Sequence, residues 1–165
     1  MRVAALVLAA VALVTANTVT AERSSIVTCE SIIYPEGSFR WRPKRVVLGV
    51  VAVPPVYTPY APESDRNDRI WPYGTKAGLV IRAGSPRVVV SVPRLGRGRA
   101  AIAWGNEGPT SALRFDTCPP ASSLGDWNPY AGGFFLRLHA ACVPLTFTVA
   151  GRSATVRFGI GKHCA

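Results

Sequence analysis

The sequence has few of the residues that enzymes most often use for acid–base chemistry. Its 165 residues include two histidines and nine Asp and Glu residues together. The histidines are His139 and His163, and neither lies in a recognised catalytic pattern. Because a general base is most often a histidine, few candidates exist for that role. This scarcity indicates a non-catalytic protein.

Nucleophile and metal motifs are also lacking. The serines of "AGSPR" and "GRSAT" do not have the G-x-S-x-G pattern of a nucleophile elbow. A zinc site would have to combine His139 and Cys142 with His163 and Cys164. Adjacent residues of a strand point to opposite faces, and cysteines in a disulfide cannot bind a metal. We therefore expect no metal site and no cofactor.

One enzymatic alternative stays open, an envelope hydrolase that uses His139. The acidic residues do not single out the pair of carboxylates that a glycosidase needs. A hydrolase would require His139 to lie in a concave pocket, within hydrogen-bond reach of an acidic partner that the sequence does not identify.

Helix-forming stretches are nearly absent after residue 21. Fourteen prolines and 15 glycines interrupt short, alternating, β-branched runs, which is a strand pattern. The expected strands lie at 26–34, 45–54, 76–84, 86–93, 99–105, 111–117 and 133–140, with a hairpin at 142–164. We predict one antiparallel β-sandwich of about eight strands. It is only loosely immunoglobulin-like, because Asp116 stands where an antibody-type domain has Tyr.

The alternation also predicts which side chains face the core. In the 133–140 strand, Phe134, Leu136 and Leu138 should point inward, and His139 should lie on the other face. The segment 54–75 has five prolines and no periodicity, so we expect a long surface loop there.

Aromatic residues in Pro- and Gly-rich segments are the weak candidates for ligand binding. They lie outside the clear strands, in loops where large aromatic surfaces can stack on a ligand at little entropic cost. They are Tyr57, Tyr60, Trp71, Tyr73, Trp127 and Tyr130. The alternative is that these rings fold back and cap the open ends of the sandwich.

The first 21 residues have the pattern of a secretory signal peptide. Arg2 precedes a run of 12 apolar residues, and Val19-Thr20-Ala21 places small or modest side chains before a cleavage point. The run is short for a membrane-spanning helix. We expect a mature domain at 22–165 that is secreted or held in the cell envelope, and not an integral membrane protein.

Four cysteines in a short exported chain predict two disulfides. Three pairings are possible, and the sequence alone does not decide among them. A hairpin turn at Ala150–Ser153 would bring Cys142 near Cys164, which favours Cys142–Cys164 and leaves Cys29–Cys118.

The chain is strongly basic, with a formal net charge of +10. Loss of Arg2 with the signal peptide leaves 18 basic and nine acidic residues, a net charge of +9. Such a charge favours association with anionic cell-wall polymers or lipid headgroups, although arginines on solvated strand faces would give it too. The basic segment "RLGRGR" at 94–99 is interpreted as a solvated hairpin turn. Nucleic acid is not expected as a partner, because its binding needs a wider basic stripe with aromatics.

Several segments together resemble a group of small exported proteins from high-GC Gram-positive bacteria. They are "KAGLVIRAG", "AAIAWGNEG", "SALRFDTCP", "WNPYAGGFFLRL" and "CVPLTFTVAGRSATVRFGIGKHC". The resemblance covers most of the chain after about Val46. It implies export, a single β domain and the cysteine pattern, but it supplies no site, because the group has no assigned biochemical activity.

These observations lead to one functional hypothesis. The chain is an exported, non-catalytic β-sandwich protein that binds cell-envelope polymers or a protein partner through its loop aromatics.

Overall fold

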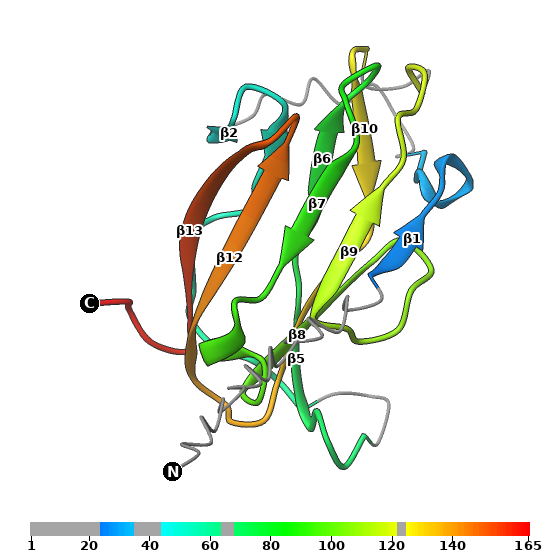
Figure 1. The fold of residues 1–165 in the computed structure, drawn as a ribbon. Coiled ribbons are helices and arrows are strands. Elements are labelled where there is room, and N and C mark those ends of the chain that lie inside the picture. Colours follow the sequence, from blue (N-terminus) through cyan, green and yellow to red (C-terminus); the bar gives the residue numbers. More distant parts are fainter. Residues whose placement is uncertain (1–23, 35–43, 64–67, 122–124) are drawn as a thin grey trace, which may run out of the picture.

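The computed structural model describes residues 24–34, 44–63, 68–121 and 125–165. The predicted signal peptide lies outside these residues, as does the 64–67 part of the long loop. The described chain forms thirteen strands and two short 3-10 helices (Figure 1). The prediction of an all-β fold is therefore confirmed.

The elements follow one another in short steps along the chain. The first seven strands are β1 (Ser25–Val27), β2 (Val46–Val47), β3 (Val51–Ala52), β4 (Tyr57–Thr58), β5 (Tyr73–Lys76), β6 (Leu79–Arg82) and β7 (Val88–Ser91). The remaining six are β8 (Ala100–Trp104), β9 (Ala112–Phe115), β10 (Trp127–Tyr130), β11 (Gly132–Leu136), β12 (Ala141–Val149) and β13 (Arg152–Ile160). The 3-10 helices are η1 (Cys29–Ser31) and η2 (Arg94–Gly96).

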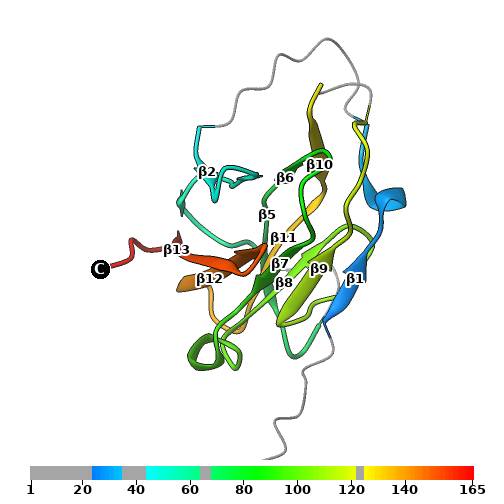
Figure 2. The same cartoon turned by 45° about the horizontal axis from the view of Figure 1, so that its top comes forward.

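The strands form three sheets in place of the predicted single sandwich of about eight strands. The largest sheet has six strands in the order β1-β9-β7-β12-β13-β4. A four-stranded sheet, β10-β6-β3-β2, and a three-stranded sheet, β5-β11-β8, lie behind it (Figures 1 and 2). Two pairings are parallel, β1 with β9 and β13 with β4, so the fold is not wholly antiparallel.

One hydrophobic core joins the layers. Alternate residues of the longer strands are buried, as their sequence pattern predicted. Examples are Leu113 and Phe115 in β9, Val143, Leu145 and Phe147 in β12, and Val156, Phe158 and Ile160 in β13. The same buried cluster contains Leu79 and Ile81 of β6 and Ile102 and Trp104 of β8. All three sheets therefore share a single core.

Gly132 and Gly133 lie where β11 passes closely between its two neighbours, β5 and β8. A Cβ atom on Gly132 would collide with the carbonyl oxygen of Ala103, and one on Gly133 with that of Thr75. The structure shows that both positions need glycine because backbone lies against each of them.

Two of the predicted strands are shorter than expected. The segment predicted at 26–34 forms strand only over β1, because the chain turns into η1 at Cys29. The run at 45–54 is a small hairpin of β2 and β3, not one buried strand. Its turn contains Leu48 and Gly49, with φ angles of 51° and 77°.

The described part of the 54–75 segment is mostly loop, but it also contains β4 and the start of β5, and Glu63 forms a bridge with Tyr73. Two other loop and core predictions are wrong. The 127–130 segment is strand β10, which pairs with β6. Leu138 is 64% exposed, because β11 ends at Leu136 before the alternation reaches it.

The structure contains both expected disulfides, Cys29–Cys118 and Cys142–Cys164. The first joins the chain after β1 to the chain after β9, two neighbouring strands of one sheet. The second ties the C-terminal residues to the start of β12. The hairpin turn is tighter than predicted, so Cys142 lies opposite Gly159.

Candidate functional site

Three of the six candidate aromatics gather at one end of the fold. This end is formed by the start of β5, the end of β11, the start of β12 and the end of β13. We call it the histidine end, because His139 and His163 both lie there. Strand pairing brings its parts together, since Leu136 lies opposite both Tyr73 and Ala100. Tyr57 similarly lies opposite Gly159.

Each of these three aromatics lies beside a cation or an imidazole. Tyr57 stacks on His163 with ring centroids 3.9 Å apart and an interplanar angle of 10°. Tyr73 meets His139 edge-on at 6.1 Å. The guanidinium of Arg137 lies 5.7 Å from the ring centroid of Trp71. The Arg137–Trp71 pair combines apolar surface with positive charge, which suits a ligand that carries both apolar groups and negative charge.

The other three candidates do not join this group. Tyr60 is 66% exposed, in the chain after β4. Trp127 lies at the far end of the nearly continuous β10–β11 ribbon, where Arg82 covers its ring at 5.0 Å. Tyr130 is 1% exposed and belongs to the core, so its side chain offers no surface to a ligand. The six aromatics therefore do not form one platform.

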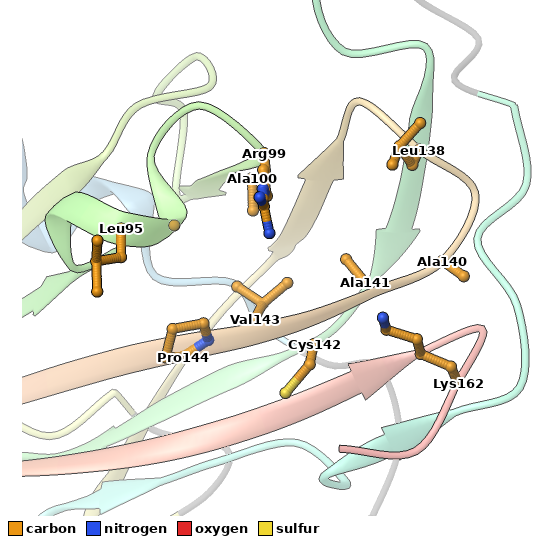
Figure 3. Close-up of a pocket in the computed structure, with 11 residues that line it drawn as sticks. Leu95, Arg99, Ala100, Leu138, Ala140, Ala141, Cys142, Val143, Pro144 and Lys162 are labelled. Carbon is orange, nitrogen blue, oxygen red and sulfur yellow. The ribbon is translucent and has the colours of Figure 1, made fainter. Parts of the chain in front are cut away.

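A groove opens at the histidine end between η2 and the chain that joins β11 to β12. It encloses about 440 Å³ (Figure 3). Leu95, Gly96, Arg99 and Ala100 line one wall, and Leu138, Ala140, Ala141 and Lys162 line the other, with Cys142, Val143 and Pro144 between them. None of these lining residues is acidic.

Two cations and two exposed leucines give the groove its chemical character. The ends of the Arg99 and Lys162 side chains turn toward the space between the walls (Figure 3). Leu95 is 96% exposed and Leu138 is 64% exposed. Exposed leucines on both walls place apolar surface beside the positive charge, and water-exposed apolar surface favours contact with a partner.

The sequence pointed to part of this groove without identifying it. The segment "RLGRGR" was interpreted as a solvated hairpin turn, yet it connects β7 and β8, which belong to different sheets. The leucine between its arginines was the only hint of a binding surface. The strand alternation predicts Leu138 in the core, and no sequence pattern singles out Lys162. Their proximity depends on three chain segments that are distant in sequence.

His139 is exposed and is not among the residues that line the groove. Its ring contacts that of Tyr73, and among the described residues no hydrogen bond or ion pair connects it to a carboxylate. The same residues hold no group of three or more His, Cys, Asp or Glu side chains arranged for a metal ion.

Comparisons of the chain with protein-family models, with curated proteins and with solved structures found no match. Among the described residues, no helix has the length and apolar character needed to cross a membrane. The geometry of the histidine end is therefore the main support for a function.

Proposed function

We propose that this protein is an exported, non-catalytic binding protein that holds an anionic polymer of the cell envelope at its histidine end. The observation that carries the proposal is the groove between Arg99 and Lys162, which has no acidic residue in its lining. Cations on both walls favour the binding of a polymer that carries repeated negative charges. The leucines and the neighbouring aromatics would contact the apolar faces of the sugars or alkyl groups between those charges.

Export and the general architecture are part of the proposal. Two disulfides favour an oxidising compartment, and the leader-like first 21 residues agree with secretion. We also propose membership of the exported protein group that the quoted segments resemble. We also propose a loosely immunoglobulin-like architecture, because the strands form two layers. The Cys29–Cys118 bridge departs from that plan, because it joins neighbouring strands of one sheet.

The proposal is tested with a phosphate-bearing envelope polysaccharide and its dephosphorylated form. Purified protein from Glu22 onward should bind the charged polymer and not the neutral one. The double variant Arg99→Gln/Lys162→Gln should raise Kd at least about tenfold, because two charge-assisted contacts to the polymer are lost. Isothermal titration calorimetry gives the dissociation constants.

A matched control removes the same charge elsewhere. Lys44→Gln/Lys76→Gln also lowers the net charge by two, but neither residue lines the groove. Its Kd should change by less than about threefold, since long-range charge effects are screened at physiological salt. Equal weakening in both double variants would mean that the net charge alone attracts the polymer, and would contradict a groove site.

A further inference from the structure

The outer edge of β13 is largely without a neighbouring strand. β13 has nine residues and pairs along its whole length with β12 on one side. On the other side β4 pairs only with Gly159 and Ile160. Among the described residues, no strand pairs with 152–158 on that side, which lies at the border of the six-stranded sheet (Figure 1).

The backbone groups that point away from β12 can be identified. Ala150 and Gly151 form a two-residue turn with φ angles of 47° and 76°. In such a turn the flanking residues, Val149 and Arg152, bond to each other, and the direction of the backbone groups then alternates. The Gly159 and Gly161 amides confirm the alternation, since they donate outward to Val56 and Thr58.

It follows that Ser153, Thr155 and Arg157 direct their N–H and C=O groups outward. All three residues are exposed, and no backbone hydrogen bond joins these groups to another described residue. Their side chains lie on the outer sheet face, where Ser153 and Thr155 hydrogen-bond to Thr148 and Thr146 of β12. The free edge is therefore a row of three donors and three acceptors ready for an added strand.

The charge along this edge determines which strand it can accept. Arg152 and Arg157 are both exposed, and the segment 152–158 has no acidic residue. Arg157 donates one hydrogen bond to an oxygen of Ala165, and its guanidinium has further donors. A second copy of the chain would bring two more arginines and no acid to the seam, and charged edge residues oppose such self-pairing. Acidic side chains opposite the two arginines would be favoured.

We propose that the free edge of β13, residues 152–158, binds an extended acidic segment of a partner protein as an added antiparallel strand. The main-chain groups of Ser153, Thr155 and Arg157 supply the ladder, and Arg152 and Arg157 select for acidic residues. This site is separate from the groove and does not depend on the function proposed there.

A designed peptide provides the probe. In the octapeptide Thr-Glu-Val-Thr-Val-Thr-Glu-Thr, antiparallel pairing places the glutamates opposite Arg157 and Arg152 and the valines opposite Val156 and Ala154. The protein should bind this peptide at least about tenfold more tightly than the same peptide with lysine for glutamate. Fluorescence anisotropy of the labelled peptides measures both affinities.

Amide hydrogen exchange shows where the peptide binds. In the free protein the amides of Ser153, Thr155 and Arg157 should exchange quickly, because they point to solvent. Saturating peptide should slow these three at least about tenfold. The amides of Ala154 and Val156, which already bond to β12, should not change.

Two pairs of variants separate backbone pairing from charge. Thr155→Pro removes an outward N–H without removing a bond to β12, and should abolish binding. Thr155→Val removes the same hydroxyl and keeps the N–H, so it should bind as the wild type does. Arg152→Glu/Arg157→Glu should reverse the preference to the lysine peptide. Circular dichroism confirms that each variant is folded.

Three results would overturn the proposal. The first is equal binding of the glutamate and lysine peptides, or no binding of either. The second is peptide-induced protection at other amides while the three outward amides stay unprotected. The third is a dimer in sedimentation that Thr155→Pro dissociates, because the edge would then serve a second copy of the chain.

Discussion

The buried environment of Tyr130 changes the acidity of its hydroxyl group. Its ring packs edge-on against Phe115 with centroids 5.0 Å apart, and its hydroxyl lies 3.7 Å from the Sγ atom of Cys118. Burial, with a smaller contribution from the negative charge of Asp116, raises the pKa of Tyr130 to about 12. A tyrosine that looked exposed in the sequence is thus held neutral in the core.

This raised pKa predicts a loss of stability at high pH. In the unfolded chain Tyr130 ionises near pH 10, whereas in the folded protein it stays protonated to about 12. The unfolded state therefore releases a proton first, and folding stability falls as pH rises from 10 to 12, by about 3 kcal/mol in full. Urea unfolding at several pH values measures the fall.

Tyr130→Phe provides the control for this effect. The variant keeps the ring in the core and removes the ionising hydroxyl, so its stability should fall less over the same pH range. An equal decline in the wild type and the variant would show that other groups cause the alkaline loss. In an absorbance titration near 295 nm, the variant should also lack the tyrosine that ionises at the highest pH in the wild type.

Asn128 and Pro129 explain why the sequence suggested a loop at 127–130. Both are turn-forming residues, but here the Asn128 side chain accepts a hydrogen bond from the Ala121 amide at 2.8 Å and donates one to the Pro119 carbonyl at 2.9 Å. β10 is the edge strand of its sheet, where proline is tolerated. These two hydrogen bonds to the preceding chain and the pairing of β10 with the distant β6 decide the conformation, and the residues 127–130 alone do not predict them.

At the scale of elements, local pairing was the predictable part of the fold. The β12–β13 hairpin follows from two alternating runs around Ala150-Gly151, and its ladder depends only on neighbours in sequence. The β2–β3 turn was missed because Leu48 adopts a positive φ that a β-branched run does not suggest. The groove was missed because its walls come from η2, the β11–β12 connection and the chain after β13.

The two disulfides close loops of very different length, so their removal should have unequal effects. Cys29–Cys118 spans 89 residues and Cys142–Cys164 spans 22. Loop-closure entropy predicts a loss of about 5 kcal/mol for the first pair and about 3 kcal/mol for the second. Denaturant unfolding of the double alanine variants of each pair measures both losses.

The order of the two losses is the decisive result. A larger loss for the Cys142–Cys164 pair would mean that native contacts of the C-terminal residues outweigh chain entropy. Thiol labelling of the unfolded wild-type protein should find no free cysteine, as the structure has none.

At the scale of the whole molecule, the shared core predicts one cooperative unfolding transition. Buried residues of all three sheets belong to one cluster, so no sheet can separate without exposing the apolar face of another. Calorimetric and van't Hoff enthalpies should therefore agree. Tryptophan fluorescence, to which the fully buried Trp104 contributes, should change together with the far-ultraviolet circular dichroism. Two separate transitions would contradict this prediction.

The Cys142–Cys164 bond affects when the groove can hold the anionic polymer that we propose as its ligand. Gly159 has no side chain, and the backbone of Lys162 and Cys164 lies against it. The bond fixes this short tail, which carries one of the two groove cations. Under the proposed function, a chain without this bond would not hold Lys162 in place on its wall of the groove, and would bind the anionic polymer less tightly. Under the proposed export, formation of the Cys142–Cys164 bond outside the cell would complete the proposed binding surface.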